Sequence, residues 1–103
     1  MDVAEHVVAA LSPRTPRERI RILLSRGFTT VQIFERLPGE VRDALGGEVE
    51  EPNARVRRGI DQVHRALIGL VEVGRVRRRR ERYAMFVNTK GERGMLVDVY
   101  RLV

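Results

Sequence analysis

The chain has 103 residues, which fits one domain, and 43% of them are apolar, which is enough to form a core. It contains no cysteine, and this excludes disulfides, thiolate-bound zinc and cysteine nucleophiles. No apolar run approaches the roughly 18 residues needed to cross a bilayer, and no signal-peptide pattern is visible. We therefore expect one soluble, cytoplasmic domain over residues 1–103.

Positive charge is concentrated in the second half of the chain. Residues 1–52 hold 7 arginines and 9 acidic residues, whereas residues 53–103 hold 13 basic and 5 acidic residues. The two halves therefore carry −2 and +8, which gives the net charge of +6. A localised basic region is typical of proteins that bind a phosphate backbone, so we expect association with the nucleoid. A merely solvated surface and an anionic membrane surface are the alternatives.

Residues 2–11 are predicted to form a short helix, with Asp2 as its N-cap. Its apolar face consists of Val3, Val7, Val8 and Leu11. One interpretation is that this helix packs on the back of the domain. The other is a homodimer contact through Val3, Val7 and Leu11, because many DNA-reading proteins are two-fold symmetric.

The clearest helix start is at Thr15, which is followed by Pro16 and by Glu18 at capping-box distance. This helix is predicted over residues 15–26. Its apolar stripe, which we expect to be buried, consists of Ile20, Leu23 and Leu24. The next helix is predicted over residues 29–37, with Thr29 and Gln32 as another capping box.

Residues 39–45 are predicted to add a helical turn or two, before the Gly46-Gly47 loop. Three acidic residues then form a patch: Glu48, Glu50 and Glu51. The patch is either a solvated loop, a device that repels phosphates and so restricts which face docks, or a partner for arginines of a second subunit.

The longest predicted helix covers residues 53–72, with Asn53 as N-cap and Gly74 just past its end. Its apolar stripe follows the 3.6-residue period and consists of Val56, Ile60, Val63, Leu67, Leu70 and Val71. The opposite face carries Arg55, Arg58, Asp61, Gln62 and Arg65.

The pattern then changes to the two-residue period of strands. After the basic segment 75–82, residues 83–88 and 95–103 are predicted to form a hairpin. A register that pairs Val87 with Met95 places Asp98 opposite Ala84. It also pairs Glu81 with Arg101, which favours it because the two charges are opposite. The aromatic residues Tyr83, Phe86 and Tyr100 either pack in the core or stack on bases.

The order of these elements resembles the winged helix-turn-helix superfamily of DNA-binding domains. Residues 30–37 (TVQIFERL) are similar to the second helix of that superfamily. Residues 67–76 (LIGLVEVGRV) are similar to a recognition helix that runs through a glycine into the first wing strand. The connection over residues 38–52 departs from the pattern, because the family joins its second and third helices by a short turn.

The resemblance implies an α+β, mostly α, winged-helix domain. It would have an N-terminal accessory helix (1–13), a three-helix core within residues 15–74 and a wing hairpin (75–103). Helix 53–72 would enter the major groove, with base contacts from Arg55, Arg58, Gln62 and Arg65. Thr29 and Thr30 would donate to a phosphate. The wing would supply backbone contacts from Arg77, Arg78, Arg79, Arg80 and Arg82, and its tip would use Lys90 and Arg93.

Motifs for catalysis are lacking. Neither GxxxxGK[ST] nor GxGxxG occurs. His6 and His64 are far apart in sequence, and no carboxylate cluster accompanies either. We therefore expect no enzymatic activity, no metal, no cofactor and no small-molecule ligand.

Three functions are compatible with the sequence. The first is sequence-specific binding of double-stranded DNA by a small transcriptional regulator, and it predicts that Arg58→Ala or Gln62→Ala relaxes base preference. The second is sequence-independent architectural or RNA binding, in which such changes weaken every sequence alike. The third is a winged-helix protein-interaction module, which would bind little DNA at physiological salt.

Overall fold

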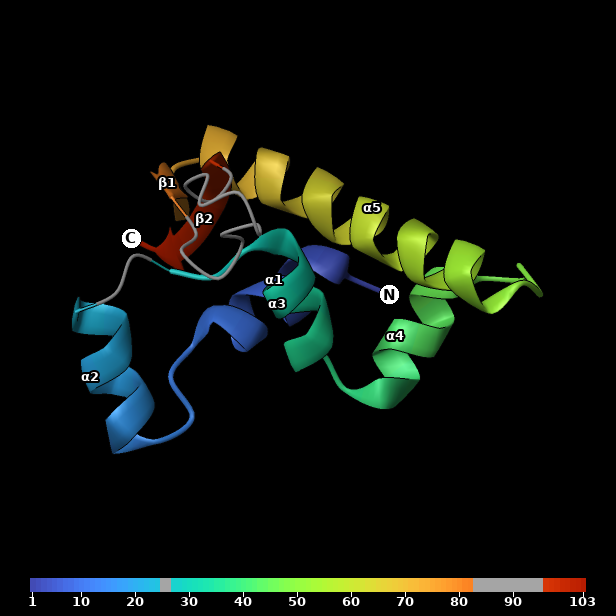
Figure 1. Cartoon of the computed structure of the whole chain (residues 1–103), viewed down its shortest axis with the longest axis horizontal. Coiled ribbons are helices and arrows are strands. Elements are labelled where there is room, and N and C mark those ends of the chain that lie inside the picture. The colour runs from blue at the N-terminus through green and yellow to red at the C-terminus, as the bar shows by residue number, and fades with distance from the viewer. Residues whose placement is uncertain (25–26, 83–95) are drawn as a thin grey trace, which may run out of the picture.

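The computed structural model describes residues 1–24, 27–82 and 96–103, and of residues 21–24 and 82 it describes the backbone alone. Over these ranges the fold is α+β and mostly helical, with two antiparallel strands at the C-terminus, as the sequence predicts. The elements are α1 Val3–Leu11, α2 Pro16–Leu24, α3 Thr30–Arg36, α4 Gly39–Gly46, α5 Pro52–Glu72, β1 Val76–Arg82 and β2 Leu96–Leu102. Figure 1 shows α5 spanning the molecule, from α4 at one end to the two strands at the other.

Local hydrogen bonds set the helix starts. The predicted capping box of α3 is present, since Gln32 N–H donates to Thr29 Oγ1 and Thr29 N–H donates to Gln32 Oε1. The predicted Asn53 cap of α5 is wrong, because Glu51 accepts from the N–H groups of Asn53 and Ala54 at 3.0 and 2.6 Å. A carboxylate has two oxygens for two donors, and Pro52 at the first position has no N–H to satisfy.

The core lies between α1, α3, α4, α5 and one face of the strands. Val7 and Leu11 of α1 are 0% and 2% exposed and belong to this core, and Val3 is half-buried against it. The predicted dimer contact through Val7 and Leu11 is therefore wrong, because their apolar surface is already covered within the chain.

Helix α2 stands to one side of the other helices (Figure 1). Its Ile20 is 58% exposed, so the predicted burial of this residue is wrong. A polar anchor holds α2 instead: the Arg36 guanidinium donates to the Glu18 carboxylate and to the Ala10 carbonyl, each at 2.6 Å. The same guanidinium lies 4.5 Å from the centre of the Phe28 ring. The side chains of Leu23 and Leu24, the rest of the predicted stripe, lie outside the described residues, whereas α1 supplies Val7, Ala10 and Leu11 to the core.

The amphipathic stripe of α5 is buried at Val63, Leu67 and Leu70, as predicted. Val56 is an exception and is 46% exposed. At that end of α5 the short helix α4 packs against it, and Val56 lines an open groove together with Phe34, Gly39 and Arg42. An apolar residue at the right helical position stays exposed where nothing covers it.

The strands pair in a different register from the predicted one. Glu81 lies opposite Val97, Asp98 lies opposite Arg80 and Arg101 lies opposite Arg77. The pairing is set by non-local contacts, because Val76 and Tyr100 are buried and Tyr100 exchanges two backbone hydrogen bonds with Phe28. Burying such side chains outweighs one charge pair worth roughly 0.2–1 kcal/mol. The predicted strand 83–88 and the Val87–Met95 pair lie outside the described residues.

Gly74 makes the turn from α5 into β1. Its φ of +77° is the left-handed conformation that glycine adopts without strain. The N–H of Gly74 donates to the Val71 carbonyl and that of Arg75 donates to the Leu70 carbonyl, which is the Schellman pattern of helix ends. The predicted helix stop at Gly74 is thus confirmed.

Candidate nucleic-acid interface

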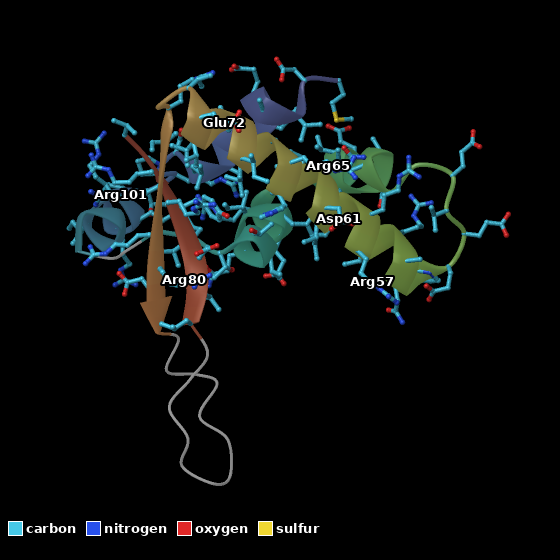
Figure 2. The ribbon with its side chains drawn as sticks, turned by 90° about the horizontal axis from the view of Figure 1, so that it is seen from above. Arg57, Asp61, Arg65, Glu72, Arg80 and Arg101 are labelled. Atoms are coloured by element: carbon cyan, nitrogen blue, oxygen red, sulfur yellow. The ribbon has the colours of Figure 1, made fainter. Side chains whose placement is uncertain are left out.

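Strand β1 presents four consecutive arginines, Arg77, Arg78, Arg79 and Arg80, and all four are exposed. Because side chains alternate along a strand, they divide between two faces of the ribbon formed by β1 and β2. The inner face, which continues from the core residues Val76 and Tyr100, carries Arg78 and Arg80. The outer face carries Arg77 and Arg79 together with Arg101 of β2. In Figure 2, Arg80 and Arg101 lie on opposite sides of the ribbon.

Two of these arginines make exposed ion pairs. Arg79 Nε lies 3.1 Å from Glu81 Oε1, and Arg80 Nε lies 3.5 Å from Asp98 Oδ1. Both guanidinium-bearing side chains remain about 70% exposed. Ion pairs of this kind contribute roughly 0–1 kcal/mol, so a phosphate can compete for either arginine.

Three of the predicted DNA contacts of the wing cannot be compared with the structure. The side chain of Arg82, and Lys90 and Arg93 at the expected wing tip, lie outside the described residues.

Only some of the α5 side chains that are predicted to contact bases are exposed. Arg58 and Arg65 are exposed and Gln62 is half-buried. Arg55 is occupied, since its guanidinium donates to the Asp43 carbonyl at 2.9 Å and to the Val49 carbonyl at 3.4 Å. Carbonyls in the last turn of α4 lack helical partners, and Arg55 satisfies one of them. These hydrogen bonds would have to break before Arg55 could reach a base, and its predicted base contact stays a prediction.

The exposed side of α5 carries both signs of charge. Figure 2 shows Arg57, Asp61, Arg65 and Glu72 spaced along the helix. Spacing of four residues between Arg57, Asp61 and Arg65 places opposite charges side by side. The predicted polar face already included Asp61, and the structure adds Arg57 and Glu72 to the exposed side.

Thr29 and Thr30 lie at the amino end of α3, and both are half-buried. Thr29 Oγ1 accepts from Gln32 N–H as the N-cap. The adjacent Phe28 bridges to Tyr100 through two backbone hydrogen bonds of 2.9 and 2.8 Å, which joins this end of α3 to the ribbon.

Charge is segregated between the two ends of α5. The segment 38–51, which contains α4 and the following loop, has five acidic residues and one arginine, a net charge of −4. All five carboxylates are exposed: Glu40, Asp43, Glu48, Glu50 and Glu51. Residues 75–82, at the other end, have six arginines and one glutamate, a net charge of +5. The ribbon end is therefore the more basic of the two, since the acidic segment 38–51 largely offsets Arg55, Arg57 and Arg58 in the first turns of α5.

Sequence reasoning missed Arg101, because the predicted register neutralised it with Glu81. Among the residues that the structure describes, no group of three or more His, Cys, Asp or Glu side chains could hold a metal ion. In the same part of the chain, no helix combines the length and apolar character of a membrane span. Comparisons with protein-family models, with curated proteins and with solved structures gave no match.

Proposed function

We propose that this chain binds double-stranded DNA in the manner of a winged-helix domain, with the ribbon on the phosphate backbone and α5 beside it. The observation that carries the proposal is the run of four exposed arginines on β1. The planar guanidinium matches phosphate oxygens with two parallel hydrogen bonds. The acidic segment 38–51 supports the same orientation, because its carboxylates would repel DNA phosphates from the surface formed by α4.

In this proposal the chain is a small transcriptional regulator, and Arg58, Gln62 and Arg65 read bases in the major groove. Arginine can bind guanine and glutamine can bind adenine through paired hydrogen bonds. The alternative is sequence-independent binding through the ribbon alone. The mixed charge of the exposed side of α5 favours this second candidate, because Asp61 and Glu72 repel phosphates along the same helix.

The test is the affinity of the purified chain for a labelled random-sequence duplex over a range of salt, measured by fluorescence anisotropy. The variant R77Q/R78Q/R79Q/R80Q should lower the slope of log affinity against log salt by about 2 to 4, since each phosphate contact contributes about 0.9. The control E48Q/E50Q changes charge at the acidic end and should leave the slope unchanged. Absence of binding, or an unchanged slope in the ribbon variant, overturns the proposal.

Selection of preferred sites from the same pool separates the two modes. A regulator should prefer a selected site over random DNA by about 10³-fold or more, and R58A or Q62A should reduce that preference. If no consensus emerges while binding stays salt-dependent, the binding is sequence-independent.

A further inference from the structure

Two arginines face each other across the ribbon. The register sets Arg77 directly opposite Arg101, so their Cβ atoms are about 4.5–5.5 Å apart. Arg77 is exposed and Arg101 is half-buried. Like charges directly opposite each other destabilise a sheet. The free chain therefore holds a repulsive pair in a position where an opposite-charge pair would be stabilising.

No carboxylate relieves this repulsion among the described residues. Arg75, Arg79 and Arg80 are each paired, with Glu5, Glu81 and Asp98 respectively. Within the same part of the chain, neither Arg77 nor Arg101 has a carboxylate within 4.0 Å. The outer face thus has three guanidinium groups and one glutamate, and that glutamate is in contact with Arg79.

The surroundings also favour an anion between the two arginines. Val99 belongs to the outer face, is next to Arg101 by strand alternation and is 2% exposed. A buried apolar neighbour on the same face lowers the local dielectric beside Arg101 and strengthens the interaction of its guanidinium group with a charge. A phosphodiester carries one negative charge on two non-bridging oxygens, and each oxygen has more than one lone pair. One such group can therefore accept hydrogen bonds from two guanidinium groups at once.

We propose that Arg77 and Arg101 form a clamp that holds one phosphate group between them. This inference rests on the proposed function, because the phosphate is taken to be a phosphodiester of the DNA backbone. It assigns the outer face of the ribbon to the backbone and adds Arg101 to the interface.

The first arm of the test uses inorganic phosphate alone and measures the thermal unfolding midpoint of the free chain, with chloride at equal ionic strength as reference. Wild type and R78Q should gain stability from phosphate, whereas R77Q and R101Q should gain none. At low salt without phosphate, R77Q and R101Q should unfold at higher temperature than wild type, because each removes the repulsion. Equal stabilisation of all four proteins by phosphate overturns the clamp.

The second arm is a double-mutant cycle on duplex affinity. R77Q and R101Q should each lower affinity about tenfold, and the double variant should lose little more, because both residues hold one phosphate. The salt slope should fall by about 0.9 in each single variant and by no more in the double variant. The matched pair R78Q and R101Q should instead multiply their effects. Multiplying effects in the Arg77–Arg101 cycle overturn the clamp.

The two arms separate the clamp from the proposed function. Stabilisation by phosphate that requires both arginines, without any duplex binding, supports the clamp and rejects DNA as its ligand. Duplex binding with independent effects of R77Q and R101Q rejects the clamp and leaves the proposed function standing.

Discussion

Gly59 and Gly69 both lie inside α5, and replacing each with alanine should change stability in opposite directions. A Cβ at Gly59 would lie 2.5 Å from Phe34 Cε2, whereas a Cβ at Gly69 would meet nothing within 4 Å. Alanine in a helix interior gains about 0.5–1 kcal/mol over glycine, and Gly69→Ala should show this gain. Gly59→Ala has the same gain but also an overpacking cost of about 1–3 kcal/mol. The helix gain cancels between the variants, so they should differ by that steric cost.

Urea denaturation followed by circular dichroism measures both free energies of unfolding, and in a domain of this size a 1 kcal/mol difference separates the melting temperatures by about 4–8 °C. Phe34→Leu in the Gly59→Ala background is the control, because a smaller side chain should restore part of the loss. If both alanine variants are stabilised equally, the close packing of α3 against α5 at Gly59 is refuted.

Three further predictions concern pH and capping. The hydrogen bond from Arg36 holds the pKa of Glu18 below its usual 4.5, so stability should fall as the pH drops below about 4.5, and Glu18→Gln should remove this part of the pH dependence of the melting temperature. Burial raises the pKa of Tyr100 above its usual 10.0. The unfolded chain then loses that proton first, so stability should decline above about pH 10 in wild type and less in Tyr100→Phe. Glu51→Ala should lower the free energy of unfolding by about 1 kcal/mol through loss of the α5 cap, whereas Glu50→Ala, next to it and exposed, should not. Urea denaturation of the two variants separates the effect of losing the cap from the effect of removing one negative charge.

Most features decided by neighbouring residues were predictable from the sequence, although the cap of α5 is Glu51 and not the predicted Asn53. The capping box at Thr29 and the helix stop at Gly74 depend on backbone donors and acceptors within one turn, so residue types at fixed spacing suffice. The amphipathic period of α5 likewise placed Val63, Leu67 and Leu70 in the core, since the period reports which residues share a face.

Features decided across the chain were not predictable in this way. The apolar stripe of α2 predicts which of its faces is apolar, but it does not predict what packs against that face. Ile20 is exposed because no described element covers it. The strand register depends on Tyr100 meeting Phe28 and on the burial of Val76, and neither is visible in the strands' own pattern. The candidate site was the least predictable part, because the sequence around Arg55 and Arg101 does not distinguish them from the other arginines. In the structure Arg55 donates to backbone carbonyls, whereas Arg101 lies opposite Arg77.

The turn at Gly74 affects the conformational entropy that the two strands would lose on binding a ligand. Hydrogen bonds at both ends of the turn fix β1 to α5, and Val103 N–H also donates to the Arg75 carbonyl at 3.2 Å. The backbone of the described strands is therefore ordered before any partner arrives, and binding restricts mainly arginine rotamers, at about 2 kcal/mol or less for each side chain. Calorimetry of complex formation should accordingly lack the large negative heat-capacity change of coupled folding at these strands. In the proposed complex, preorganisation of this kind would lower the entropic cost of binding.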